Sequence, residues 1–282
     1  EDGSVDFKPT CGNILSGVAS AAIEMGLHPS SEGATSVAIH AVNTGAEIIA
    51  KVQTPRGQIS YAGQAAIDGV PGTAAPVELN FMKVAGSSTG AFLPTGNLTD
   101  EIDGIPVTCM DVAMPMVIAR AADFGLSGYE TRDELDKNIL FFQRMEALHI
   151  KAGAAMGMGD VRKSVTPKFG LIAPAKHGGS LTTRYFMPWK THPTMAVTGS
   201  QCLASCALTP GTVADGLLER PIEIPAKITL EHPMGSMEVL VDYCLKDGAF
   251  EHKSAGLIRT CRKLADGQVY VPAEIWDGNT GR

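Results

Sequence analysis

A cysteine, a glycine and an asparagine stand together at residues 11–13, directly before a run of small and apolar residues that is typical of a buried helix. The first amides of a helix have no partners within it, and the helix dipole adds about half a positive charge at that end. A thiolate at Cys11 would be stabilised there and could transfer protons, and Asn13 could donate a hydrogen bond to a ligand. That Cys11 is instead a small core residue is equally compatible with the sequence.

A similar arrangement occurs about 187 positions later, where Thr198, Gly199 and Ser200 precede another apolar, alanine-rich stretch. We therefore predict two helix N-termini, and a gap between them would bind a small polyanion through unpaired backbone amides. Gly12 and Gly199 would let the ligand approach the backbone, because neither residue has a Cβ. Ser200, like Asn13, would add a side-chain hydrogen bond.

Further candidates for binding a carboxylate are basic residues. Arg184 and His192 come shortly before the second predicted helix, where a carboxylate could be bound. A histidine followed by proline is as often a turn residue, so both interpretations of His192 stay open. Lys168 and Arg259 are weaker candidates, since each could equally be the solvated end of a strand.

The six cysteines form no CxxC pair and no regular framework, so we expect reduced thiols in a compartment like the cytosol. Cys202 and Cys206 are one helical turn apart, but no zinc-type pattern accompanies them, and no metal site is predicted. Because a lone cysteine is usually a small buried apolar residue, we expect Cys109, Cys244 and Cys261 in the core.

The composition is ordinary for a globular protein, with 282 residues of which 44% are hydrophobic and 19% charged. The net charge of −7 argues against nucleic acid as a partner, because binding phosphates needs a clustered basic surface. An anionic ligand would be bound locally, by backbone amides and a few placed arginines or lysines. No apolar run is long enough to span a bilayer, so we predict no membrane partner and a cytoplasmic location.

The 31 glycines and 17 prolines separate many short extended runs, which indicates a chain rich in β-structure with tight turns. One amphipathic helix is predicted over residues 132–157, where apolar residues recur every three or four positions. Strands are predicted at 35–45 and 46–55, paired through the turn "NTG", and at 57–63, 75–86, 105–121, 168–175, 181–187, 226–232, 237–245 and 267–272.

The positions of the two predicted helix N-termini indicate two units. If the second unit begins near residue 105, its helix starts roughly 95 residues into it, whereas the first starts at residue 11. Two equal units would then need about 85 more residues before Glu1. We therefore expect a C-terminal part of a first domain over 1–102, a second domain over 103–272 and a tail over 273–282.

Four segments of the chain resemble the PrpF-like isomerases: "VDFKPTCGNILSGVASAAIE", "IDGVPGTAAPVELNF", "AGSSTGAFLPTGN" and "RTCRKLADGQVYVP". This family includes 4-oxalomesaconate tautomerase, 3-methylitaconate isomerase, 2-methylaconitate isomerase and aconitate Δ-isomerase. The resemblance implies an α/β (α+β) fold of the diaminopimelate-epimerase type. Such a fold has two similar domains, each a β-sheet wrapped around a central helix, with the active site in the cleft between them. It also implies that no cofactor is used.

The chemistry that the resemblance implies is a 1,3-allylic proton shift on an unsaturated di- or tricarboxylate. A family lysine removes a proton from carbon, and the cysteine that corresponds to Cys11 works opposite it. That lysine belongs to the region upstream of residue 1, and no lysine of this chain takes its place. Related amino-acid epimerases have a second cysteine where this chain has Thr198-Gly199-Ser200, which disfavours two-thiol racemisation and leaves Cys202 as a core residue.

The sequence thus predicts a cofactor-independent isomerase or tautomerase, with 4-oxalomesaconate ranked first because "GGSLTTRYFMPW" resembles the oxalomesaconate tautomerases more than the methylaconitate branch. The segment "THPTMAVTGSQ" is less typical of them and keeps aconitate Δ-isomerase open, beside 2-methylaconitate or 3-methylitaconate isomerase. A different class, a non-catalytic protein that binds carboxylates in the same cleft, also stays open. The expected partner is a small polycarboxylate, and a homo-oligomer is left open.

Overall fold

The structure, a computed structural model, describes residues 11–187, 189–246 and 249–278. Residues 1–10 of the predicted first domain and 279–282 of the predicted tail lie outside the described residues. The helices are α1 (Gly12–Glu24), α2 (Arg132–Asp136), α3 (Ile139–Ala155) and α4 (Val197–Leu208), with short 3-10 helices η1 (Pro55–Gly57) and η2 (Ala121–Phe124).

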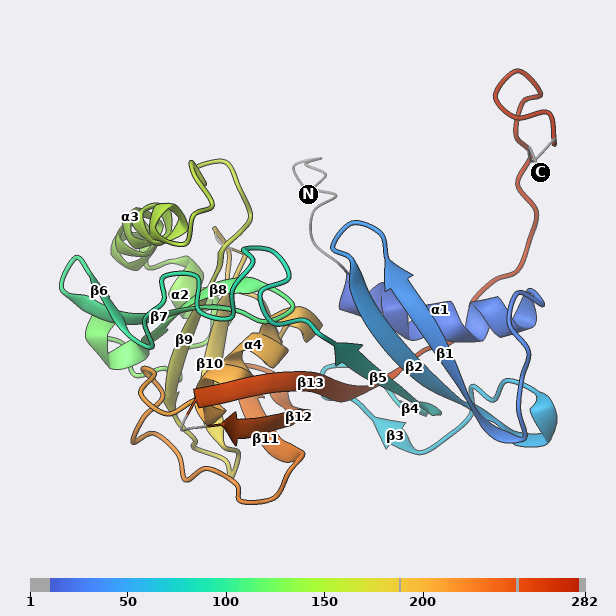
Figure 1. Ribbon diagram of the computed structural model, residues 1–282, viewed down its shortest axis with the longest axis horizontal. Coiled ribbons are helices and arrows are strands. Elements are labelled where there is room, and N and C mark those ends of the chain that lie inside the picture. The colour runs from blue at the N-terminus through green and yellow to red at the C-terminus, as the bar shows by residue number, and fades with distance from the viewer. Residues whose placement is uncertain (1–10, 188, 247–248, 279–282) are drawn as a thin grey trace.

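The strands are β1 (Gly33–Ala41), β2 (Ala46–Thr54), β3 (Ala65–Ala66), β4 (Thr73–Ala74), β5 (Pro76–Met82), β6 (Asp100–Ile102), β7 (Ile105–Asp111), β8 (Pro115–Arg120), β9 (Lys168–Pro174), β10 (Leu181–Phe186), β11 (Ala226–His232), β12 (Gly235–Lys246) and β13 (Ala249–Thr260). Eleven of them form one sheet in the order β1-β2-β5-β13-β12-β11-β10-β9-β8-β7-β6, and β3 pairs with β4. The β8–β9 and β10–β11 pairs are parallel. Because β13 pairs with β12 on one side and with β5 on the other, it joins the two lobes seen in Figure 1.

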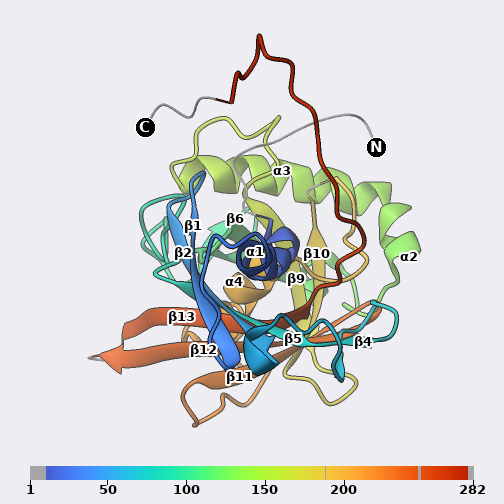
Figure 2. The same ribbon diagram turned by 90° about the vertical axis from the view of Figure 1, so that its right-hand side faces the viewer.

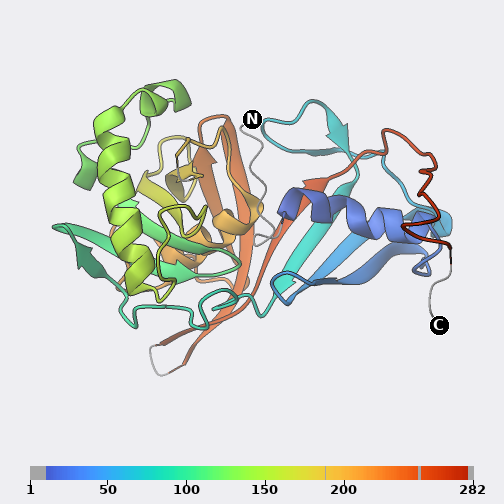
Figure 3. The same cartoon turned by 90° about the horizontal axis from the view of Figure 1, so that it is seen from above.

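Each lobe curves its part of the sheet around one helix. In Figure 2, α1 lies in the middle of its lobe, with β1 and β2 beside it and β5 below. In the other lobe, α4 packs against β7, β8, β11, β12 and β13. Seen from above in Figure 3, α1 and α4 lie end to end at the junction of the lobes.

The residue types explain why these two helices are central. All twelve residues of α4 are buried, and most are alanine, serine, cysteine or another small residue, so strands can close around it at normal packing density. β2 shows the alternation of a half-buried strand, with Ile48, Ala50 and Val52 directed into the core around the helices. A second core lies on the other side of the sheet, where α3 packs Phe141 and Met145 near Phe169 and Phe186.

Most of the predicted elements are confirmed, including the β1–β2 hairpin and the strands β5, β9, β10, β11 and β12. The segments 57–63 and 267–272 are not strands, so those two predictions are wrong. The run 105–121 is two strands that reverse at Ala113, where φ is +58°. The run 132–157 is two helices, because the Asn138 side chain caps a new helix by accepting a hydrogen bond from the amide of Phe141 at 3.0 Å.

The predicted boundary between residues 102 and 103 falls in the turn that joins the paired strands β6 and β7. The sheet runs on through both lobes, and the division into two domains stays a prediction. Within the described ranges, no helix is both long and apolar enough to cross a membrane.

Candidate active site

The N-termini of α1 and α4 are in direct contact. Gly12 is the first residue of α1 and Val197 the first of α4, and a Cβ built on Gly12 would lie 2.4 Å from the Cβ of Val197. Gly12 is therefore needed for this contact between helices. We expected Gly12 to let a ligand approach the backbone. The structure leaves no gap for a ligand between Gly12 and Val197, so the glycine instead allows the two helices to pack together.

Neither central helix is capped by the side chain of its own N-cap residue. The N-cap residue of α1 is Cys11 and that of α4 is Ala196, and neither side chain accepts a hydrogen bond from the first turn. The two helices on the other side of the sheet differ, because Thr131 caps α2 in a capping box and Asn138 caps α3. The N-cap side chains of α1 and α4 thus leave the first-turn amides to other groups.

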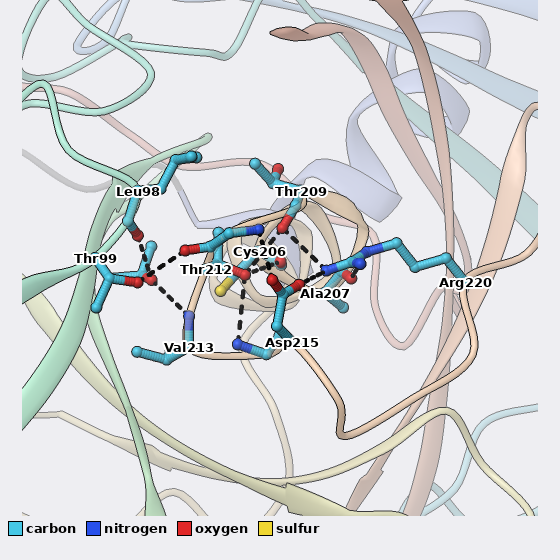
Figure 4. Close-up of polar contacts among 12 residues, drawn as sticks. Leu98, Thr99, Cys206, Ala207, Thr209, Thr212, Val213, Asp215 and Arg220 are labelled. Carbon is cyan, nitrogen blue, oxygen red and sulfur yellow. Dashed lines mark hydrogen bonds and ion pairs between the residues drawn. The ribbon is translucent and has the colours of Figure 1, made fainter. Parts of the chain in front are cut away.

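The opposite end of α4 is well satisfied, as Figure 4 shows. The hydroxyl of Thr212 lies 2.8 Å from the carbonyl oxygen of Cys206 and 3.0 Å from that of Thr209. The Nε of Arg220 donates to the carbonyl oxygen of Ala207 at 3.0 Å, which puts a cation at the negative end of the helix dipole. The helix is therefore anchored at its C-terminus and open to hydrogen bonding at its N-terminus.

Cys11 and Asn13 are exposed at the start of α1, while Gly12 between them is buried. Cys109 and Cys202 are fully buried, which confirms that they are core residues. Burial raises the pKa of Cys109 to about 12 and also raises that of Cys202. Cys244 and Cys261 are only partly buried. Cys261 packs against the core around α1 and α4, whereas the prediction that Cys244 belongs to the core is wrong.

Thr198, Gly199 and Ser200 lie inside the first turn of α4 and not before it, since the helix begins at Val197. All three are buried, and the Ser200 hydroxyl donates to the carbonyl oxygen of Val197 at 2.8 Å. A Cβ on Gly199 would lie 2.1 Å from the ring of Tyr185. Gly199 and Ser200 therefore serve packing within the lobe, and the amides at the start of α4 are what this segment offers a ligand.

Arg184 is not brought to the helix N-termini. It lies on β10 next to Tyr185, and successive residues of a strand point to opposite faces. Its Nε donates to the carbonyl oxygen of Glu130 at 2.7 Å, and its Nη1 donates to that of Thr183 at 2.8 Å. The guanidinium therefore holds the loop before α2 against the face of the sheet that is turned away from α4.

His192 lies close to the first turn of α4. Its ring meets the ring of Tyr185 edge to face, with centroids 5.8 Å apart, and its Nδ1 accepts a hydrogen bond from the amide of Thr194 at 3.0 Å. Burial lowers the pKa of His192, and the positive charges of Lys168 and Arg132 lower it further. The imidazole is therefore neutral near pH 7.

Lys168 is on the same side of the sheet as His192. It is the first residue of β9 and lies two residues before Gly170, so both are on the same face of the sheet. This face is turned toward α4, because a Cβ built on Gly170 would lie 3.2 Å from the side chain of Leu203. Its charge acts on the pKa of His192, so the structure brings these two candidates together. Arg259 is buried on β13, on the same face as Ala255 and Leu257, which pack in the core around α1 and α4.

Two further residues, Asp68 and His232, lie where the lobes meet and were not indicated by the sequence. Asp68, between β3 and β4, accepts a hydrogen bond from the amide of Ser236 at 2.7 Å. His232 is buried at the end of β11; burial lowers its pKa most, while the charge of Asp68 raises it. Asp68 stands in the segment "IDGVPGTAAPVELNF", which the sequence indicated only through its resemblance to the PrpF-like isomerases. Its partner is far away in the sequence, so no local pattern could have revealed the contact.

No three His, Cys, Asp or Glu side chains are grouped as metal ligands in the part of the chain that the structure describes. The site therefore offers backbone amides, one exposed thiol, an exposed amide side chain and nearby basic residues. Such a set can bind carboxylates, stabilise a developing negative charge and exchange protons.

Comparison with known proteins extends this description. The sequence profile of a family described as "PrpF protein" matches residues 1–272. YbhH of Escherichia coli (strain K12) is 46% identical over 268 residues, which cover 95% of this chain and 75% of YbhH. A (4E)-oxalomesaconate Delta-isomerase of Novosphingobium sp. (strain KA1) is 45% identical over 261 residues, 93% of this chain and 72% of that protein. A 4-oxalomesaconate tautomerase of Pseudomonas putida (strain KT2440) is 40% identical over 278 residues, 99% and 76% of the two chains.

Among solved structures, the crystal structure of a methylitaconate-delta-isomerase superposes on this chain with a TM-score of 0.83. The two are 31% identical, and the match covers 99% of this chain and 77% of that one. This similarity confirms the predicted fold class, a mixed α/β fold in which sheets curve around central helices.

Proposed function

The chain belongs to the PrpF family of isomerases, and we propose that it shifts a double bond in 4-oxalomesaconate by moving a proton between the ends of a three-carbon unit, without a cofactor. Two of the relatives similar to this chain are named for oxalomesaconate. The observation that carries the proposal is the contact of two uncapped helix N-termini beside the exposed thiol of Cys11.

The reaction needs what these helix N-termini offer. Removal of an allylic proton leaves a carbanion whose charge spreads onto a neighbouring carboxylate or keto oxygen. Amides that are already oriented hold that charge better than water does, and loss of one such donor costs about 10²–10³-fold in kcat in enzymes where it has been measured. The N-cap side chains of Cys11 and Ala196 do not use these amides, and in this proposal the amides bind the substrate.

The proton balance is simple. One proton leaves the first carbon, the double bond moves by one position, and one proton returns at the far end, so nothing is oxidised or reduced. Cys11 exchanges the proton at one end of the three-carbon unit, and Asn13 donates a hydrogen bond to the bound acid. Lys168 attracts the carboxylate that lies nearest the start of α4.

Proton NMR in D₂O tests the proposal, with the full-length protein and oxalomesaconate, trans-aconitate or 2-methylaconitate as the substrate. We expect double-bond migration and deuterium uptake with oxalomesaconate. Turnover of trans-aconitate or 2-methylaconitate alone would keep the reaction class and reject the substrate. Saturable binding without exchange in any of the three would reject catalysis and support a carboxylate-binding protein.

A further inference from the structure

Two histidines in the lobe of α4 lie in turns of the same kind. His192 and His232 are each followed by a proline, which has no N–H group, so the nearest amide along the chain is two residues on. The Nδ1 of His192 accepts a hydrogen bond from the amide of Thr194 at 3.0 Å, and that of His232 accepts one from the amide of Met234 at 3.3 Å. A neutral imidazole whose Nδ1 accepts a hydrogen bond carries its hydrogen on Nε2. Both rings are therefore held as Nε2–H donors.

A loop of the other lobe packs against both turns. It consists of residues 67–72, joins β3 to β4 and belongs to the lobe of α1 (Figure 1). A Cβ built on Gly69 would lie 3.1 Å from the side chain of Thr194 and 3.8 Å from that of Met234. These are the two residues whose amides donate to the histidines. The position of the loop therefore bears on both hydrogen bonds.

The carboxylate of Asp68 fixes this loop to the lobe of α4. Its Oδ2 accepts a hydrogen bond from the amide of Ser236 at 2.7 Å and lies 3.3 Å from the Ser236 hydroxyl. Gly235 allows this approach, because a Cβ there would lie 2.4 Å from the same carboxylate oxygen. From the other side, the Nη2 of Arg262 donates to the carbonyl oxygen of Pro71 at 2.9 Å. The loop is thus held from both sides and kept against the two turns.

Of the two histidines, His192 is the one that a ligand at the candidate active site can reach. His232 is buried, whereas His192 is partly exposed. The ring of His192 meets that of Tyr185 edge to face, and a Cβ on Gly199, in the first turn of α4, would lie 2.1 Å from the same Tyr185 ring. The Nε2–H group of His192 therefore adds a neutral donor near the amides of α4, and such a donor stabilises an oxygen on which negative charge develops.

We propose that Asp68 is a positioning residue for the isomerase reaction. By holding its loop on Ser236, it keeps Gly69 against Thr194 and thereby keeps the Nε2–H group of His192 directed at an oxygen of the bound acid. Asp68 itself neither touches the acid nor transfers a proton. That the oxygen belongs to the reacting acid rests on the proposed function, whereas the effect of Asp68 on the orientation of the His192 ring does not.

A double-variant cycle tests whether Asp68 acts through His192, with the full-length protein and the NMR assay. Because the donor acts on charge that develops as the proton leaves, Asp68→Ala and His192→Gln should each lower kcat roughly 10- to 100-fold and change KM less than about threefold. Adding Asp68→Ala to His192→Gln should then lower kcat by less than about twofold more. Asp68→Asn keeps an oxygen that accepts from the Ser236 amide, so it should retain most of the turnover. The control is Glu238→Ala, which removes an exposed acid from the same strand as Ser236 and should keep wild-type turnover.

Ring ¹⁵N NMR of the ligand-free protein at pH 8 measures the effect on His192 directly, and the His192→Gln variant identifies its signals. In the wild type, Nδ1 should carry no hydrogen and Nε2 should carry one. Asp68→Ala should move both ring signals toward those of free histidine, and the Asp68→Asn and Glu238→Ala variants should not.

Three results would overturn the proposal. They are unchanged His192 ring signals in Asp68→Ala, losses of kcat that multiply in the double variant, and a lower melting temperature of Asp68→Ala with wild-type kcat, which would give Asp68 a structural role alone. If the ring signals move as expected but the wild type isomerises none of the three acids, the proposed function fails and the control of the His192 ring by Asp68 stands.

Discussion

Gly12 and Val197 hold the N-termini of the two central helices together, because a Cβ on Gly12 would lie 2.4 Å from that of Val197. Carbon atoms that are not bonded to each other do not approach so closely, so this contact requires glycine. It fixes the amides of α1 relative to those of α4, and with them the place of Cys11. The position of the candidate site thus depends on a packing contact between helices.

We predict that Gly12→Ala both destabilises the protein and lowers its activity. The new methyl group must push Val197 away, and overpacking of this kind costs about 1–3 kcal/mol. Urea unfolding and the NMR assay measure the two effects. Gly17→Ala on the same helix is the matched control, because its Cβ would meet nothing within 4 Å. There, alanine should stabilise the helix by up to about 1 kcal/mol.

A double variant separates the clash from other causes. Val197→Gly removes the atom that a Cβ at residue 12 would strike, so the double variant should lose less stability than the two single variants lose together. Strictly additive losses in the double variant would contradict the contact described here.

Local patterns account for the elements that the sequence predicted well. The β1–β2 hairpin follows from alternating residues on either side of a short turn, and the helix after Cys11 follows from its run of small apolar residues. The start of α4 was misplaced because Thr198 and Ser200 resemble capping residues, while Ala196 occupies the N-cap.

Long-range pairing explains what the sequence could not reveal. β13 was not predicted because Gly256 and charged residues interrupt its apolar pattern, and its place depends on β5 and β12. The contact of Asp68 with Ser236 and the buried state of Arg259 likewise depend on strands brought together by folding. Arg184 was a reasonable candidate by its position in the chain, but the face of β10 on which it lies directs it elsewhere.

Cys11→Ser should separate activity from stability. Serine is a poor proton carrier compared with a thiol, so we expect kcat to fall by about two orders of magnitude or more. At the same position serine can cap α1, so the melting temperature should stay the same or rise slightly. Cys244→Ser is the control, because the Cys244 side chain lies on β12 and is only partly buried, and this variant should retain wild-type turnover. Near-full activity of Cys11→Ser would remove Cys11 from the mechanism.

Ala196→Asp tests whether the open N-terminus of α4 is used for binding. A carboxylate at this N-cap position would accept hydrogen bonds from the first turn and interact favourably with the helix dipole, so the protein should gain about 1 kcal/mol of stability. It would also occupy the amides and repel an anionic substrate, so KM should rise roughly tenfold. Ala196→Ser caps without a charge and should raise KM less. A stabilised Ala196→Asp enzyme with unchanged KM would show that these amides do not bind the substrate.

His252 on β13 should make the protein less stable in acid. Both ring nitrogens are buried without a hydrogen-bond partner among the residues that the structure describes, and burial lowers the pKa of His252 to about 4, although the charge of Asp242 acts in the opposite direction. An unfolded histidine titrates near 6.5, so between about pH 6.5 and pH 4 the unfolded chain binds the additional proton. The contribution of the neutral His252 to the free energy of unfolding is therefore complete above about pH 6.5. It is lost as the pH falls through that window, by roughly 3 kcal/mol at pH 4.

His252→Leu removes the titrating group. The free energy of unfolding of this variant, measured by urea titration at several pH values, should fall less steeply with decreasing pH than that of the wild type, by up to about 1.4 kcal/mol per pH unit. An equal slope in His252→Leu would mean that His252 does not titrate in this range.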